Sequence, residues 1–309
     1  MNVTDENTFL ALDVDGECRD MMRLYGPGEI AWMVADDLGV NPGEVPRDES
    51  GRRVMPARKW IDGLKAWLRL TWLNDPSVNY FAEIVLRLYR KRGVLKGNDN
   101  FPCLSEIIEE AEHDVIHRDP GKKITRDKVV DRLCSLRSML PGLDVQKSRN
   151  LHELIGKRSL IIDLTETKDI ALPIFFNFLV MVLTSSFRHE PGEPIRRLLV
   201  MEEAHAYLGG HMDKRKGDAG ETAGSGVLRS LRKAGFLGLV VDQLVSDLAP
   251  AVLGNLSSIF CLRLARRECI VRAGSLLGLE KWQERELALL PARGNCETVA
   301  PRSAVSPQG

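Results

Sequence analysis

Short apolar runs alternate along this chain with longer segments in which apolar side chains recur at helical spacing. The apolar runs predict buried strands, and the segments with helical spacing predict amphipathic helices. The predicted strands are 8–13, 30–34, 159–164, 198–201, 237–241 and 258–264. The predicted helices after residue 150 are 170–187, 226–234 and 250–255. Because strands and helices alternate there, we expect an α/β fold with a mainly parallel sheet covered by helices on both faces.

Between residues 57 and 142 the pattern contains helical spacing and no strong strand. The predicted helices begin near residue 57, include 80–89, and cover 104–117 and 126–139, the last with Thr125 as its N-cap. Trp60, Trp67 and Trp72 fall at helical spacing, which favours packing between helices over stacking on nucleic-acid bases. The predicted organisation is the first part of an α/β core at 1–56, a helical insertion at 57–150, the rest of the core at 151–300 and a disordered tail at 301–309.

The composition sets limits on compartment and partners. Lysine plus arginine equal aspartate plus glutamate, at 43 each, so no overall charge draws the chain to nucleic acid, although a local basic patch stays open. The six cysteines show no C-x-x-C pair, which favours reduced thiols in the cytosol over disulfides or a metal. The polar amino terminus is no ordinary signal peptide, and the longest apolar stretch, 170–183, is too short to span a bilayer. We expect a soluble cytoplasmic protein without membrane insertion.

Two adjacent carboxylates follow one of the predicted strands. The apolar run Leu198–Met201 ends at Glu202-Glu203, and the next predicted strand is followed by Asp242-Gln243. The carboxyl ends of parallel strands form the ligand crevice of doubly wound α/β domains. Two acids there can hold a hydrated Mg²⁺ and activate a water for attack on a phosphate, or they can simply be exposed carboxylates at a strand end. The sequence contains no Gly-x-x-x-x-Gly-Lys-Ser/Thr, the motif of a phosphate-binding loop.

Several short motifs occur in a characteristic order along the chain. They are Asp13-x-x-Gly16-Glu17, Asn41-Pro42, the strand that ends at Asp163-Leu164, Glu202-Glu203-Ala204-His205 and Asp242-Gln243. In this order the chain resembles the HerA–FtsK superfamily of P-loop ATPases, from about residue 8 to about residue 300. The likeness is greatest to HerA-type DNA translocases, with conjugation and type IV secretion ATPases of the TraG kind as relatives. It implies a RecA-like core, ATP and Mg²⁺ as cofactors, a ring-shaped oligomer and DNA as a possible partner.

The resemblance assigns roles to the residues around the two strand ends. Glu202 matches the acid that holds Mg²⁺ through water, and Glu203 matches the base that polarises the attacking water. His205 accompanies these acids in the motif, and Gln243 matches the glutamine that senses the γ-phosphate. Both residues also have a structural interpretation. A lone histidine such as His205 is usually structural, and a glutamine after a strand, such as Gln243, often forms hydrogen bonds only within its own loop.

Other charged residues extend the predicted site. Asp13 and Glu17 lie near the expected crevice and match cofactor-binding positions, although a structural turn is the simpler explanation. Arg232, favoured over Arg229, could enter the site of a neighbouring subunit in a ring, with a solvated helix face as the alternative. A basic cluster around the predicted strand 258–264 could contact DNA phosphates or lie on a solvated surface, and comprises Arg263, Arg266, Arg267 and Arg272.

Three functions are compatible with this reading. In the superfamily a P-loop strand and helix precede the segment that matches Phe9–Glu17, and the present sequence does not contain that motif. The first function is a HerA-like ATP-dependent DNA translocase or helicase subunit, inactive alone, with the P-loop supplied elsewhere, for example by a companion chain. The second is a catalytically dead scaffold or regulator of an intact ATPase. The third is a decayed gene fragment without a stable fold.

Overall fold

The computed structural model describes residues 7–23, 28–115, 119–156, 158–190, 192–209 and 223–290. The predicted tail at 301–309 and the last residues of the predicted helix 104–117 lie outside these ranges. The described residues form two compact units. The first comprises the residues up to Glu202 together with Gly226–Val240, and the second comprises the residues from Glu203 to Ser225 and from Val241 onward.

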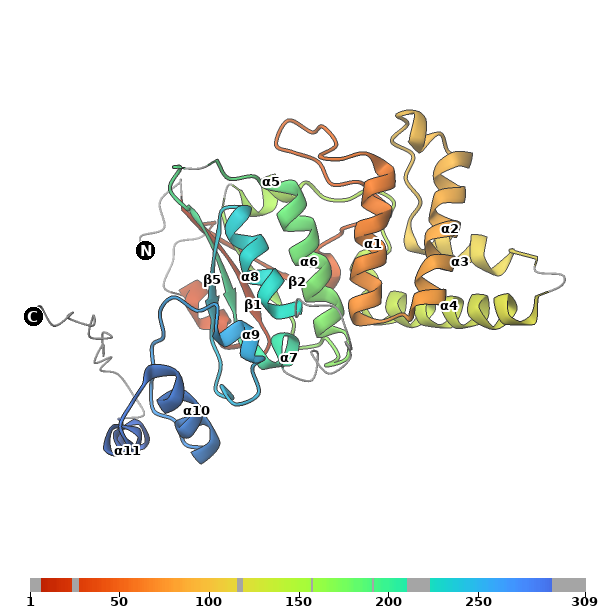
Figure 1. Ribbon diagram of the computed structural model, residues 1–309. Coiled ribbons are helices and arrows are strands. Elements are labelled where there is room, and N and C mark those ends of the chain that lie inside the picture. Colours follow the sequence, from red (N-terminus) through yellow and green to blue (C-terminus); the bar gives the residue numbers. More distant parts are fainter. Residues whose placement is uncertain are drawn as a thin grey trace, which may run out of the picture. The chain divides into compact units, whose positions relative to one another are not determined.

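Five parallel strands form the sheet of the first unit (Figure 1). Their order is β2-β3-β1-β4-β5. The strands are β1 (Thr8–Asp13), β2 (Ile30–Val34), β3 (Ser159–Asp163), β4 (Arg197–Met201) and β5 (Phe236–Val240). The inner strands β1 and β3 are buried along their whole length, which explains why they read as continuous apolar runs. The prediction of an α/β fold with a parallel sheet flanked by helices is confirmed.

Helices and short 3₁₀ segments make up the remaining regular structure. The α-helices up to Glu202 are α1 (Ala57–Thr71), α2 (Asp75–Lys91), α3 (Leu104–Glu112), α4 (Pro120–Met139), α5 (Leu151–Ile155) and α6 (Leu172–Ser186). Those that follow are α7 (His205–Leu208), α8 (Ala223–Lys233), α9 (Pro250–Leu253), α10 (Arg267–Leu277) and α11 (Lys281–Leu289). The 3₁₀ segments are η1 (Glu17–Arg23), η2 (Ala35–Asp37), η3 (Val94–Lys96) and η4 (Pro141–Leu143). Within the described ranges, no helix combines the length and the apolar character needed to cross a membrane.

The block α1–α4 is joined to the sheet through α6, which lies between the sheet and α1 (Figure 1). The indole Nε1 of Trp67 on α1 donates to the carbonyl of Ile174 on α6 (2.9 Å), and its ring lies 4.7 Å from that of Phe178. Trp60 is buried and donates from Nε1 to the carbonyl of Pro42 (2.8 Å). Both tryptophans therefore serve packing, as their helical spacing indicates.

The start of α4 differs from the prediction. The helix begins at Pro120, and the Asp119 side chain caps it by accepting a hydrogen bond from the backbone N of Lys122 (3.0 Å). Thr125, the predicted N-cap, lies inside the helix and donates from Oγ1 to the carbonyl of Gly121 (3.0 Å). An aspartate followed by proline at the first helical position is the stronger start signal, because proline needs no hydrogen bond there.

The predicted strand 258–264 is wrong. This stretch of the second unit has no regular structure, and its Phe260 and Leu262 side chains are exposed. An apolar run becomes a strand only where a neighbouring strand accepts and donates backbone hydrogen bonds, and among the described residues the sheet ends at β5. Arg263, Arg266 and Arg267 therefore lie on irregular chain and at the start of α10 instead of around a strand.

A Gly43→Ala substitution is expected to lower the free energy of unfolding by about 3 kcal/mol, the upper range for a residue too large for its site. A Cβ at Gly43 would lie 2.0 Å from the carbonyl oxygen of Pro102, so one of two backbone segments must move. The matched control is Gly226→Ala on α8, where a Cβ meets nothing within 4 Å, and where alanine should stabilise the helix by about 0.5–1 kcal/mol. Urea unfolding measures the free energy of unfolding of both variants. Equal changes in the two would contradict the close contact between Gly43 and Pro102.

Candidate functional site

The carboxyl ends of the parallel strands bring three acidic residues to one edge of the sheet. Asp13 ends β1, Asp163 ends β3 in register with it, and Glu202 directly follows β4. All three belong to the first unit and are buried. This edge is the position at which parallel α/β sheets bind ligands, so the placement of Asp13 and Glu202 agrees with the sequence prediction.

Asp163 is the acid whose charge is compensated. Its Oδ1 accepts hydrogen bonds from the backbone N (2.9 Å) and Oγ1 (2.6 Å) of Thr165, and its Oδ2 pairs with Nη2 of Arg19 (2.8 Å). The Arg19 guanidinium also lies over the ring of Trp32, 5.1 Å from its centre. Burial alone would raise the pKa of Asp163, but the bonds from Thr165 and Arg19 hold it below its ordinary value. We infer a structural role for this ionised group.

Asp13 and Glu202 form a pair of adjacent buried carboxyl groups. Asp13 Oδ1 accepts from the backbone N of Gly16 (2.8 Å), and Glu202 Oε2 accepts from that of Val14 (3.1 Å). Burial and then the adjacent Asp13 carboxyl raise the pKa of Glu202 to about 7. A ligand atom of Cys18 lies within 4.8 Å of both carboxyl groups, and burial together with their charges raises the pKa of its thiol to about 12.

Glu203, His205 and Asp242 form a separate cluster inside the second unit. His205 Nδ1 lies 3.3 Å from Glu203 Oε2 and 3.1 Å from Asp242 Oδ2. Asp242 also accepts hydrogen bonds from the backbone N of His205 (2.5 Å) and of Leu244 (2.5 Å), which fixes its position at the start of α7. The same ring nitrogen of the histidine thus lies beside two carboxylates, which brings together three groups that can exchange protons.

The backbone of Glu203 is strained. Its φ is 44°, and it is the one non-glycine residue with a positive φ among those that the structure describes. Such a conformation is uncommon for a residue with a long side chain and costs on the order of 1–3 kcal/mol. Strain of this kind concentrates at functional sites, where surrounding contacts hold it, so it favours a functional role for the Glu203 carboxylate.

The remaining predicted residues lie on exposed positions. Glu17 begins η1, Arg232 lies in the last turn of α8, and Gln243 follows the end of β5. The exposed arginines of the basic cluster are Arg263, Arg266 and Arg267. The roles given to these residues by the resemblance stay predictions.

Sequence reasoning missed two members of the acidic clusters. Asp242 was visible as the acid that directly precedes Gln243, but the resemblance drew attention to the glutamine. Cys18 follows Glu17 at the start of η1, and only the folding of this turn onto the sheet brings its thiol to Asp13 and Glu202. No sequence pattern indicates that proximity.

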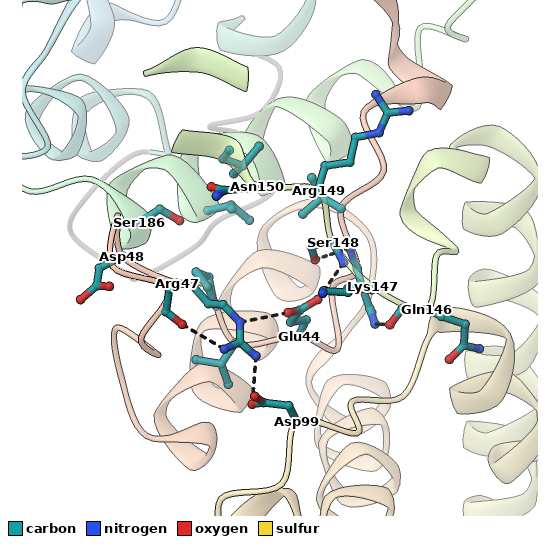
Figure 2. A pocket seen from close by; sticks show the side chains of 17 residues that line it. Glu44, Arg47, Asp48, Asp99, Gln146, Lys147, Ser148, Arg149, Asn150 and Ser186 are labelled. Carbon is teal, nitrogen blue, oxygen red and sulfur yellow. Dashed lines mark hydrogen bonds and ion pairs between the residues drawn. The ribbon is translucent and has the colours of Figure 1, made fainter. Parts of the chain in front are cut away.

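A cavity of about 520 Å³ lies elsewhere in the first unit (Figure 2). Its charged lining is largely paired: Arg47 contacts Asp99 (2.9 Å) and Glu44 (3.3 Å), and Glu44 accepts from the backbone N of Ser148 (2.7 Å). The cavity shares no lining residue with either acidic cluster. We therefore assign it no part in the candidate site.

Comparisons with known proteins identify the fold. The sequence matches no protein-family model and no curated protein. In shape it is similar to VirB4 of Thermoanaerobacter pseudethanolicus, with a TM-score of 0.62 and 16% identity over 91% of this chain and 76% of that one. The plasmid coupling protein TrwB in complex with ADP and Mg²⁺ gives a TM-score of 0.55 and 15% identity, over 97% of this chain and 88% of TrwB. TrwB with the non-hydrolysable ATP analogue ADPNP gives 0.51 and 14%, over 93% and 81%.

This chain has the fold of VirB4 and of the plasmid coupling protein TrwB. These comparisons confirm, at the level of fold, the resemblance to P-loop ATPases read from the sequence. At this low identity the comparisons establish architecture, and they leave the chemistry to be argued from the residues themselves.

Proposed function

We propose that this protein is a subunit of an ATP-dependent DNA translocase or helicase of the HerA type, acting in the cytoplasm as part of an oligomeric ring. The observation that carries the proposal is the strained Glu203, whose carboxylate faces a histidine fixed by Asp242. TrwB, which has the same fold, binds ADP and Mg²⁺. A nucleotide hydrolase needs a base beside a metal-binding acid, and consecutive residues Glu202 and Glu203 supply both kinds of group.

The residues divide the chemistry between them. Glu202, with Asp13 beside it, would hold Mg²⁺, which supplies positive charge to the phosphate oxygens as the bond to the leaving group breaks. Glu203 would take a proton from the attacking water as the water oxygen bonds to the γ-phosphorus, and His205, held beside Asp242, would position the Glu203 carboxylate. Arg232 of a neighbouring subunit, the γ-phosphate contact of Gln243 and DNA contacts of the basic cluster belong to the same proposal.

A phosphate-binding loop must be supplied by another segment, either a preceding part of the same polypeptide or a companion chain. The open side of the sheet supports this part of the proposal. Leu198 and Val200 on β4 are in register with Leu237 and Leu239 on β5, so the four side chains lie on one face. Leu198 and Val200 are partly exposed, and Leu237 and Leu239 are exposed.

The opposite face of the same two strands is covered. A Cβ on Gly238 would meet both Leu228 of α8 and Met201 of β4 at 3.2 Å, so α8 packs closely there. β5 is also the edge of the sheet among the described residues. A parallel strand added beside β5, with its helix over the open β4–β5 face, would end at the same edge as Asp13 and Glu202. The loop between that strand and helix would then reach the acids.

The test is to express the chain together with the polypeptide encoded immediately upstream, in frame or in an adjacent reading frame. We expect a complex that carries Gly-x-x-x-x-Gly-Lys-Ser/Thr and binds ATP. Leu237→Lys should weaken its assembly at least about tenfold, because a charge on the open face disfavours burial. Val271→Lys is the matched control, since Val271 and Leu237 are both 51% exposed but Val271 lies on α10 of the other unit. Sedimentation or size-exclusion chromatography measures assembly.

A catalytically dead scaffold is the second candidate, favoured by the lack of the phosphate-loop motif in this sequence. It predicts assembly with an intact ATPase and no change in turnover when Glu203 is replaced. If no such upstream sequence exists, or if Val271→Lys disrupts the complex while Leu237→Lys does not, the translocase proposal fails in its present form.

A further inference from the structure

One oxygen of Asp13 has no hydrogen-bond donor although the side chain is completely enclosed. Asp13 is 0% exposed, and its Oδ2 lacks a partner in the described structure, while Oδ1 accepts from Gly16. A buried carboxylate oxygen without a donor loses its hydration and gains nothing in return, which is costly. Something positively charged or protonic is therefore expected at Oδ2.

The neighbouring aspartate at this sheet edge has hydrogen-bond donors on both of its carboxylate oxygens. Asp163 ends β3 in register with Asp13, and it is bonded by Thr165 and by the guanidinium of Arg19. Asp13 has no such cation in the described structure. Asp13 and Asp163 therefore differ in their hydrogen-bond partners although both lie at the ends of adjacent buried strands.

Two further ligand-bearing side chains lie beside the Asp13 carboxyl group. One carboxylate oxygen of Asp13, one of Glu202 and the Sγ of Cys18 all lie within 4.8 Å of one another. Glu202 and Cys18 are both buried, at 8% exposure each, so the cluster is largely shielded from bulk water. Two carboxylates and a thiol, one of the carboxylates with an oxygen that lacks a donor, are a ligand set for a metal ion.

We propose that Asp13, Cys18 and Glu202 bind a divalent metal ion of borderline softness, with Zn²⁺ as the natural example, in the absence of nucleotide. The thiol decides the class of metal: sulfur ligands select Zn²⁺ and its relatives, whereas Mg²⁺ binds oxygen ligands. On binding, Cys18 gives up its proton to solvent and the thiolate becomes the ligand. Three protein ligands leave a further position on the ion for water.

This site shares Asp13 and Glu202 with the proposed ATPase, but its test does not depend on ATPase activity. Metal binding here requires neither ATP nor a phosphate loop, so it is measured on the chain alone. A failure to bind metal leaves the ATPase proposal intact, and a lack of turnover leaves the metal site intact.

The experiment is a Co²⁺ titration of the whole metal-free chain, followed by absorption spectroscopy. Co²⁺ takes the place of Zn²⁺, and a thiolate ligand produces an intense near-ultraviolet charge-transfer band in addition to the weaker visible bands. We expect one equivalent of Co²⁺ to give that band, and Zn²⁺ to remove it by displacement. Cys18→Ser should abolish the band, whereas Cys134→Ser, which alters a half-buried thiol on α4, should leave it unchanged.

Asp13→Asn should lower the Co²⁺ affinity at least about tenfold, since even outer-shell partners of metal ligands contribute about 10–100-fold. Circular dichroism establishes that each variant is folded, and Cys18→Ala serves as a second variant should Cys18→Ser unfold. Three results would overturn the proposal: no charge-transfer band in the parent protein, a band that survives in Cys18→Ser, or visible bands alone. Absence of metal binding together with stabilisation by Asp13→Asn would show instead that a proton shared with Glu202 satisfies Oδ2.

Discussion

Glu203→Gln is expected to lower ATP turnover by the complete complex about 10²–10⁴-fold, the usual contribution of a general base. Glutamine has nearly the shape of glutamate but accepts no proton, so ATP binding should be preserved. The effect should be large because the carboxylate is held in a strained conformation against His205, with Asp242 behind it. Phosphate release at saturating ATP measures turnover, and a fluorescent nucleotide measures binding.

The control for this prediction is Glu286→Gln, which makes the same change at an exposed position on α11 of the same unit. Its turnover should equal that of the parent. The chain without its phosphate loop should show negligible turnover in either form. Unchanged turnover in Glu203→Gln would remove the base from the mechanism, and turnover by the chain alone that vanishes in this variant would reveal an unrecognised phosphate site.

Raising the pH from about 4.5 to about 7 is expected to lower the free energy of unfolding through Glu202. The folded pKa of this group is raised from 4.5 to about 7, chiefly by burial and next by Asp13. Below pH 4.5 the carboxyl is protonated in both states and the contribution is fully present. Between the two values only the unfolded state ionises, so stability falls as the pH rises. The loss is complete above pH 7 and reaches at most about 3 kcal/mol.

The substitution Glu202→Gln should flatten this pH dependence, because the amide does not titrate. Urea unfolding at pH 5 and pH 8 in the presence of a chelator measures the difference for parent and variant. Glu286→Gln again provides the control and should keep the slope of the parent, since that side chain is exposed. A parent protein that grows more stable over this interval, with the same slope in Glu202→Gln, would contradict the environment assigned to Glu202.

The predictions that succeeded were those in which a local pattern determines the structure. β1 and β3 were identified within one residue because strands buried on both faces must be apolar throughout, and the acids at the strand ends followed from that. The segment 258–264 has the same apolar character, yet a strand also needs a partner, and no pattern within the segment encodes one. Cys18 and Asp242 escaped notice for a related reason, since their roles depend on which turn folds against which strand end.

The open β4–β5 face has a consequence for the life of this protein in a cell. Two exposed aliphatic side chains, Leu237 and Leu239, beside the partly exposed Leu198 and Val200, form a surface to which chaperones and proteases bind readily. Protein molecules made in excess of the segment that covers this surface would be bound by chaperones or degraded by proteases. Molecules with the surface covered would persist. The abundance of the protein would then follow the supply of its partner, and stoichiometry would be maintained without dedicated regulation.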